Sequence, residues 1–336
     1  MKKDYVSVNE FAPRDGRLSV YFKKMVRKKS DGFAAVFDGQ VYLIDGGLEI
    51  DLEMLRYLGE LREDWLRNAP ENVDRESARL ELHVIVSHPH PDHIGVLPQV
   101  FSDPRFCVLE LFAPERSYRS KPGPHRLEKM AEYEDKLCAL LPLLEEYHHV
   151  AKDVLRIPFG AKYPICPAEG DVLLDLYTAP FDWSEDRESE EEGFGYLLRS
   201  SNPHNPNYAA NPELGWTNGA LNGNSLWVRL RKGKQTVLIT GDQRATDQML
   251  GAMIRYHGEA EFRCDVLKLT HHGEHNYPVD LIRAASPSVT VFTVTRERGT
   301  PETVELCQKI STPYFLGDGN LIITLNGETL EAKQYE

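Results

Sequence analysis

The stretch IVSHPHPDHIGVLPQ, residues 85–99, decides the fold. A short apolar run ends, and three histidines and an aspartate follow within six residues. In an extended backbone His88 and His90 point to the same side. Asp92 and His93 follow where the chain turns, so they can face a second point a few ångströms away. The two intervening prolines stiffen this turn and lower the entropy lost on ordering it.

This spacing predicts a metal site with two ions. Imidazole nitrogens and carboxylate oxygens are ligands that zinc, manganese and iron accept. A single ion rarely takes four ligands from one turn, whereas two ions about 3.5–4 Å apart need them and further ligands from elsewhere. Asp242 follows a buried strand in TVLITGDQ, and His271 and His272 follow another in DVLKLTHHGE. A lone histidine would be interpreted as packed or exposed, but three strand ends together indicate two divalent ions, zinc or manganese.

Length and composition indicate a globular protein. The 336 residues suffice for one large α/β domain or two small ones, and the 41% hydrophobic and 27% charged residues are ordinary values. No apolar run could span a membrane, and the N-terminus lacks the apolar stretch of a secretory signal, so we expect a cytoplasmic protein without membrane contacts. The five cysteines form no CxxC pair and are expected to be buried and structural: Cys107, Cys138, Cys166, Cys264 and Cys307.

The charge pattern bears on the substrate. A net charge of −13 argues against tight, non-specific binding of nucleic acid over the whole surface. A local basic cluster runs against this trend: Lys23, Lys24, Arg27, Lys28 and Lys29. We interpret it as the solvated tip of a hairpin, with a phosphate contact as the alternative.

Strand and helix patterns alternate, with hairpins at both ends of the chain, which predicts a mixed α/β fold. No linker divides the chain, so a single domain over 1–336 is expected. A helical insertion is predicted at about 114–155, and the Asn-, Pro- and Gly-rich segment 200–225 is interpreted as a binding loop or lid. The other elements are strands at 17–25, 32–45, 80–87, 171–180, 225–240, 264–270, 288–294 and 320–333 and helices at 49–67 and 242–258.

Four motifs resemble those of the metallo-β-lactamase-fold hydrolases in order and spacing: LIDGG, SHPHPDHIG, ITGD and LTHHG, at 43–47, 87–95, 239–242 and 269–273. The resemblance covers roughly Ser19 to Leu330 without the insertion. It implies an αββα sandwich with a dinuclear site at one sheet edge. By position, the first metal would be bound by His88 and His90, the second by Asp92, His93 and His271, and both by the bridging Asp242. Asp45 would orient a ligand through a hydrogen bond.

The chain departs from that family at one ligand. Most members carry another first-metal histidine before the bridging aspartate, where this chain has Asn222 and Asn224. The pattern is most similar to the hydrolase domain of competence DNA-uptake (ComEC-like) proteins and to phosphorylcholine esterases, which also lack this histidine. The resemblance thus implies an open first-metal site, which His204 could complete. In that subgroup a serine follows HHG, and Glu274 replaces it here.

These features predict a metal-dependent hydrolase, and a phosphodiesterase above all, in which a metal-bridging hydroxide attacks phosphorus. Asp92 would hold the second metal and steady the nucleophile, His272 would be a proton donor or a packed residue, and Asn224 would support the pocket. The substrate would be a small diester or single-stranded nucleic acid. Two alternatives stay open: a lactone or β-lactam hydrolase, and a metal-binding regulatory module without turnover.

Overall fold

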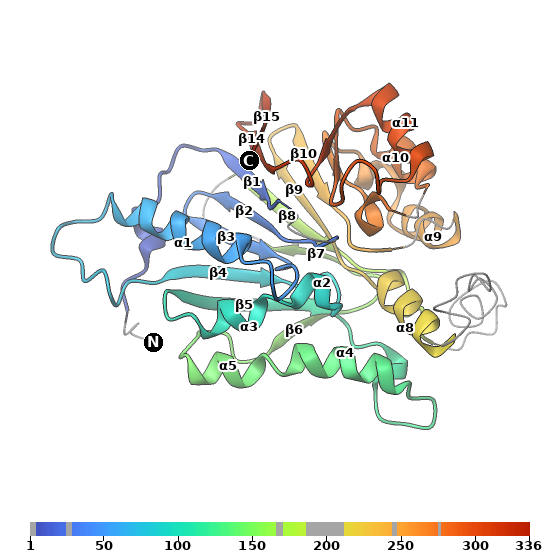
Figure 1. The fold of residues 1–336 in the computed structure, drawn as a ribbon, viewed down its shortest axis with the longest axis horizontal. Coiled ribbons are helices and arrows are strands. Elements are labelled where there is room, and N and C mark those ends of the chain that lie inside the picture. The colour runs from blue at the N-terminus through green and yellow to red at the C-terminus, as the bar shows by residue number, and fades with distance from the viewer. Residues whose placement is uncertain (1–4, 25–28, 166–170, 186–211, 244–246, 275–276) are drawn as a thin grey trace.

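The computed structural model describes residues 5–24, 29–165, 171–185, 212–243, 247–274 and 277–336 and contains two β-sheets that lie face to face (Figure 1). The first has eight strands, in the order β15 (Leu330–Tyr335), β14 (Asn320–Leu325), β1 (Leu18–Phe22), β2 (Phe33–Phe37), β3 (Gln40–Ile44), β4 (Leu80–Ile85), β5 (Phe106–Pro114) and β6 (Val154–Ile157). The second has seven, in the order β13 (Thr312–Phe315), β12 (Val289–Phe292), β11 (Val266–Lys268), β10 (Gln235–Ile239), β9 (Trp227–Lys232), β8 (Val172–Tyr177) and β7 (Lys162–Ile165).

Helices cover the outer face of each sheet (Figure 1). Those on the first sheet include α1 (Glu53–Leu66), α2 (Pro91–Ile94), α3 (Leu97–Ser102), α4 (Glu128–Cys138) and α5 (Leu141–Glu146). Those on the second are α9 (Asp247–His257), α10 (Val279–Ala285) and α11 (Pro301–Ile310), while α8 (Pro212–Gly223) lies near the end of the sheets. The predicted αββα sandwich is confirmed, and α4 and α5 confirm its helical insertion.

The alternation of side chains along each strand creates the layers. On β1, Leu18, Val20 and Phe22 point into the core between the sheets, whereas Tyr21 points outward and stacks on Tyr57 of α1 at 3.9 Å between ring centroids. A separate core lies between the second sheet and α9, α10 and α11. Each sheet therefore has two covered faces.

One strand gives a direct test of this layering. On β8, Leu174 is 1% exposed in the core between the sheets, and its neighbour Leu173 is 43% exposed on the other face. We expect Leu174→Ala to lower the free energy of unfolding by about 2–5 kcal/mol, because it removes buried methyl groups and leaves a cavity. Leu173→Ala is the matched control and should change it by less than about 0.5 kcal/mol. Equilibrium urea unfolding measures both, and equal losses would contradict the placement of β8.

Parallel strands bring the predicted motifs to one edge. Strands β3, β4, β5 and β6 run parallel in the first sheet, and β10, β11, β12 and β13 run parallel in the second. The carboxyl ends of parallel neighbours meet at the same sheet edge, so the residues after β3, β4, β10 and β11 can converge. The backbone N–H of Leu226, before β9, donates to the carbonyl of Ser87 at 2.9 Å and joins the two sheets there.

The LIDGG turn after β3 has a local reason for its glycines. Gly47 has a φ of +96°, and a Cβ on it would lie 2.5 Å from the Cε atom of Lys23. Lys23 is fully buried beneath this turn, where its amine pairs with Asp51 and donates to Ser30 Oγ at 2.9 Å. The interpretation of Lys23 as part of a solvated hairpin tip was therefore wrong, because an internal carboxylate compensates its charge.

Two further segments differ from expectation. Helix α8 occupies part of the segment that was interpreted as a loop. The helix was not predicted because its Asn and Gly residues are poor helix formers. Packing compensates: Ala220 and Leu221 of α8 join a buried cluster with Trp183. Strand β5, which lies between the histidine motif and the insertion, was not predicted from the sequence.

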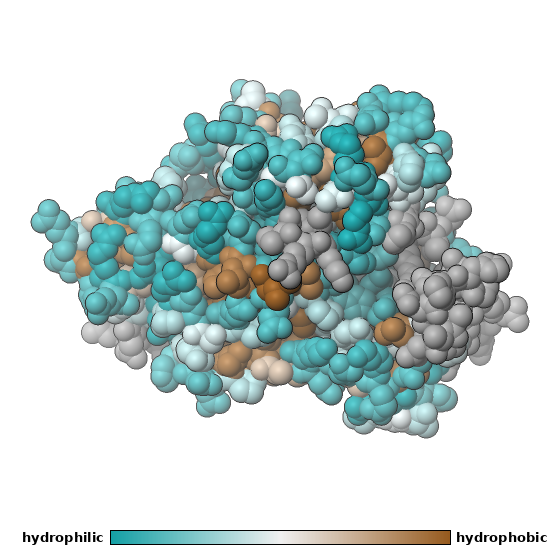
Figure 2. Space-filling model, viewed as in Figure 1, coloured by the Kyte–Doolittle hydropathy of each residue, from teal (hydrophilic) through white to brown (hydrophobic). Residues whose placement is uncertain are grey.

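The face of the molecule shown in Figure 2 is mainly hydrophilic, with separate hydrophobic patches. None of the helices in the described ranges combines the length and hydrophobicity that crossing a bilayer requires. Of the five cysteines, the four in described ranges are free thiols, and Cys107, Cys264 and Cys307 are buried, as expected. Cys166 lies outside the described residues.

Candidate metal centre

The ends of four strands place acidic and imidazole side chains in one buried cluster. Asp45 follows β3, the histidine motif follows β4, Asp242 follows β10, and His272 lies in a short 3₁₀ helix, Thr270–Gly273, after β11. The members with exposures of 8% or less are Asp45, His88, His90, His93, Asp242 and His272. Polar groups buried this deeply need partners, because an unpaired one costs free energy.

Asp242 stands at the centre of this cluster. One ligand-type atom each of Asp92, His93, Asp242 and His272 lies within 4.8 Å of the others. The Oδ2 atom of Asp242 is 3.3 Å from Nε2 of His93 and 2.9 Å from Nε2 of His272. The His272 Nε2 atom is also 3.5 Å from Asp92 Oδ2. Two carboxylates and two imidazoles therefore share one small volume.

The far nitrogen of His93 is held by a carboxylate and a hydroxyl. Its Nδ1 lies 2.8 Å from Asp45 Oδ2 and 3.2 Å from Ser87 Oγ. Asp45 also accepts the backbone N–H and the hydroxyl of Ser87, both at 2.7 Å. Asp45 thus holds the ring of His93 on its Nδ1 side, and Nε2 faces Asp242.

His272 has the same arrangement from the other side. Its Nδ1 lies 2.8 Å from Asp31 Oδ1 and 2.8 Å from Thr293 Oγ1, which leaves Nε2 turned toward Asp242. Asp31 is fully buried and pairs with the equally buried amine of Lys268. Lys268 also donates to the carbonyl of Thr240 at 2.9 Å. Imidazoles anchored by carboxylates in this way are typical of metal ligands.

His88 and His90 form a second pair beside this group. Nε2 of His88 lies 2.9 Å from Nδ1 of His90, as two ligands of one ion would converge. The His88 ring centroid is 4.1 Å from that of His93, so the pair adjoins the Asp242 cluster. Nδ1 of His88 lies 3.1 Å from Ser87 Oγ and 3.4 Å from Ser225 Oγ.

Burial and neighbouring charges set the ionisation states of the histidines and aspartates in the cluster. Burial holds the pKa of His88 well below its usual value and lowers the pKa of His90 to about 4, so both rings are neutral at pH 7. Burial also opposes charge on His272, but Asp242 and Asp31 raise its pKa to about 10. Burial would raise the pKa of Asp242, yet His272 and His93 hold it well below its usual value. The carboxylates thus require positive charge at the centre of the cluster.

Three buried atoms of the cluster have ion-pair contacts but no hydrogen bond among the described residues: Nε2 of His93 and of His272, which lie beside Asp242, and Oδ1 of Asp242, which is 3.7 Å from the amine of Lys268. Such atoms normally have a partner, and each of these is a metal-ligand atom with a free lone pair when its group is suitably ionised. The donor set of imidazoles and carboxylates is the one zinc and manganese take. The residues present therefore fit divalent ions.

A small pocket opens onto the cluster, with a volume of about 190 Å³. Four of the predicted metal ligands line it: His90, Asp92, Asp242 and His271. Its remaining wall consists of Lys29, Pro91, Tyr133, Asn218 and Asn222. Tyr133, from the helical insertion, packs edge-on against His90 at 4.9 Å between ring centroids. The insertion therefore contributes to the site.

Some predicted residues lie elsewhere. Asn224, which was expected to support the pocket, is buried and does not line it. Its side-chain oxygen accepts a hydrogen bond from the backbone N–H of Trp183 at 2.9 Å, and its amide N–H donates to Asp182 at 2.7 Å. His204 falls outside the described residues, so the expectation that it completes the first metal site stays open.

The roles expected of the adjacent residues His271 and His272 do not match their positions in the structure. His271 was predicted to bind the second metal, but His272 is the residue whose Nε2 lies 2.9 Å from Asp242 Oδ2. His271 lies on the pocket wall, with Nε2 3.5 Å from the Lys29 amine. Both residues have left-handed backbone conformations, with φ of 48° and 64°. Such a backbone turns neighbouring side chains in directions that a regular strand or helix pattern does not predict.

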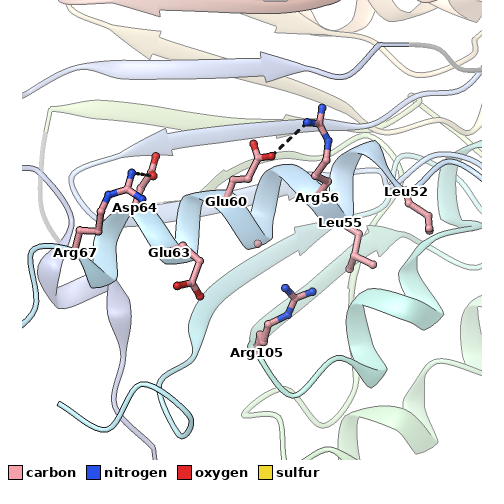
Figure 3. Close-up of a pocket in the computed structure, with 9 residues that line it drawn as sticks. Leu52, Leu55, Arg56, Glu60, Glu63, Asp64, Arg67 and Arg105 are labelled. Atoms are coloured by element: carbon pink, nitrogen blue, oxygen red, sulfur yellow. Dashed lines mark hydrogen bonds and ion pairs between the residues drawn. The ribbon is translucent and has the colours of Figure 1, made fainter.

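Four larger pockets among the described residues lack any member of this cluster in their lining. Figure 3 shows a groove of about 510 Å³ along α1, lined by charged side chains that include Arg56, Glu60, Asp64 and Arg67. These groups pair with one another: Arg56 lies 3.3 Å from Glu60, and Arg67 contacts Asp64. Because its charges are already balanced and exposed, the groove has the character of an ordinary helix surface.

Neither a protein-family model nor a curated protein sequence matches the chain. Similar solved structures include a mutant of the CmlA β-hydroxylase, at 13% identity and a TM-score of 0.45. That match covers 94% of this chain and 54% of the hydroxylase chain, so this chain spans about half the length of the hydroxylase. The metallo-β-lactamase-fold protein YhfI from Bacillus subtilis is 9% identical, with a TM-score of 0.44 and coverages of 94% and 100%. Zn²⁺-bound PqqB from Methylobacterium extorquens is 13% identical, with a TM-score of 0.42 and coverages of 92% and 99%. Similarity at this level carries no conclusion about the reaction.

Proposed function

We propose that the chain is a metal-dependent hydrolase that cleaves phosphodiesters. The observation that carries the proposal is the convergence of buried imidazole and carboxylate ligand atoms around Asp242, which lines a pocket. His88 and His90 would hold one divalent ion, and Asp92, His93 and His272 a second, with Asp242 between them. His272 takes the position expected of His271 because its Nε2 atom faces Asp242 and Asp92.

When bound, a pair of divalent ions would lower the pKa of a bound water and neutralise negative charge on the phosphoryl oxygens. The chain's own residues prepare the ligands. Asp45 and Asp31 accept a hydrogen bond from the Nδ1 side of His93 and His272, which fixes each tautomer with Nε2 toward the centre. Lys268 balances the charge of Asp31, so the carboxylate stays ionised although it is fully buried.

His272 does not suit the role of proton donor to a leaving group. Both of its nitrogens are directed to protein carboxylates, and its side chain has no exposed surface. His271 instead faces the pocket, where a substrate would lie. We therefore place His272 among the ligands and His271 among the residues that contact substrate.

An assay panel tests the proposed function. The purified protein is first analysed for bound elements, then loaded with Mn²⁺ or Zn²⁺ and offered bis-p-nitrophenyl phosphate, a lactone, nitrocefin and single-stranded DNA. We expect two metal equivalents and turnover of the diester. Turnover of the lactone or nitrocefin alone would favour the alternative hydrolase, and two bound metals without any turnover would favour a regulatory module.

A further inference from the structure

One wall of the pocket consists of groups that the metal centre does not use. Lys29 comes from the segment between β1 and β2, and Asn218 and Asn222 come from α8. These three side chains face the same small volume as His90, Asp92 and Asp242. An amine and two amides on the far side of a hydrolytic centre are the groups that would contact the substrate rather than the ions.

Lys29 brings a positively charged amine to this wall of the pocket. Among the described residues it forms no ion pair, and its nearest polar contact is His271, 3.5 Å from its amine. Asp92 and Asp242 lie in the same pocket, but two divalent ions would more than balance their two charges. The pocket with its ions would therefore be positive even before the charge of Lys29 is added. A neutral ligand leaves that charge uncompensated, whereas an anion balances it.

Asn218 and Asn222 supply hydrogen-bonding groups at the same wall. They are four residues apart on α8, so they lie on one face of the helix, a turn apart. The side-chain oxygen of each is buried without a hydrogen-bond partner among the described residues, and Asn222 is only 3% exposed. The O and N atoms of an amide are interchangeable by rotation, so these positions can present N–H donors to a ligand.

We propose that Lys29, Asn218 and Asn222 form a subsite for a non-bridging oxygen of a phosphodiester and so select anionic substrates over uncharged esters and lactones. This inference deepens the proposed function and rests on it for the identity of the reaction. The small pocket volume of about 190 Å³ suits the phosphoryl group itself, with the two ester substituents directed outward. Tyr133 completes this wall and keeps His90 in place through its ring contact.

The test compares Lys29→Met with Lys24→Met in the metal-loaded protein. Lys24 belongs to the same segment and is also partly buried, but it is not among the residues that line the pocket. We expect Lys29→Met to raise the KM for bis-p-nitrophenyl phosphate at least about tenfold, because a charge-assisted hydrogen bond is lost. The kcat should change less, Lys29→Arg should restore much of the KM, and any lactone turnover should be unaffected.

A binding measurement separates this inference from the proposed reaction. Dimethyl phosphate has a poor leaving group, so calorimetric titration reports its affinity without turnover. Weaker binding by Lys29→Met than by Lys24→Met supports the subsite, even if the wild-type protein hydrolyses no diester and the proposed function fails. Equal KM values and equal affinities in the two variants would overturn the subsite, and so would a wild-type protein that does not bind dimethyl phosphate.

Discussion

Replacing Asp242 with alanine abolishes hydrolysis: we expect kcat/KM for bis-p-nitrophenyl phosphate to fall at least about 1000-fold. Asp242 faces the imidazoles of both His93 and His272: its Oδ2 atom is 3.3 Å from His93 Nε2 and 2.9 Å from His272 Nε2. Its Oδ1 atom makes no hydrogen bond with the described residues and has the amine of Lys268 3.7 Å away, so it could bind a second ion. Loss of several kcal/mol of transition-state stabilisation corresponds to a rate change of this size, because about 1.36 kcal/mol is tenfold.

The same variant should lose metal, which elemental analysis after gel filtration measures. Asp265→Asn is a matched control: Asp265 stands just before β11, at the opposite end of the same sheet, and accepts the backbone N–H of Thr236 at 2.7 Å. Asparagine can accept that bond too, so activity and metal content should stay near wild type. If Asp242→Ala retains both metals and most of its activity while circular dichroism shows a folded protein, the centre is not built around Asp242.

The local part of the site could be predicted from the sequence. His88, His90, Asp92 and His93 lie within six residues, so spacing alone brings them together. The fold class followed from alternating strand and helix patterns, which depend on periodicities of a few residues. Features whose cause lies within one turn or one strand are visible in a single sequence.

The residues that hold these ligands could not be predicted in the same way. Asp31 contacts His272, 241 positions along the chain, and pairs with Lys268, which is almost as distant in sequence. A buried aspartate and lysine look like two unremarkable surface charges until the strands that carry them come together. The one signal was that Lys268 stands within DVLKLT, an otherwise apolar strand, where a charged residue is expected to have a buried partner.

Substitution of the two adjacent histidines distinguishes a ligand from a pocket residue. We expect His272→Ala to lose one of the two metal equivalents and to lower kcat/KM at least about 100-fold, since removing even a group that orients a ligand costs 10- to 100-fold. His271→Ala should keep both metals and lower kcat/KM by less than about tenfold. Metal content by elemental analysis and steady-state kinetics on the diester give the two readouts.

The comparison is well matched because both positions have left-handed backbone conformations, with φ of 64° at His272 and 48° at His271, so alanine is strained about equally at each. The reverse result, with metal lost in His271→Ala alone, would assign His271 to the second ion. The hydrogen bonds argue against that outcome. Nδ1 of His272 is held at 2.8 Å by both Asp31 and Thr293, and Lys268 keeps Asp31 ionised. A ring fixed on that side can present only Nε2, and Nε2 already points at Asp242.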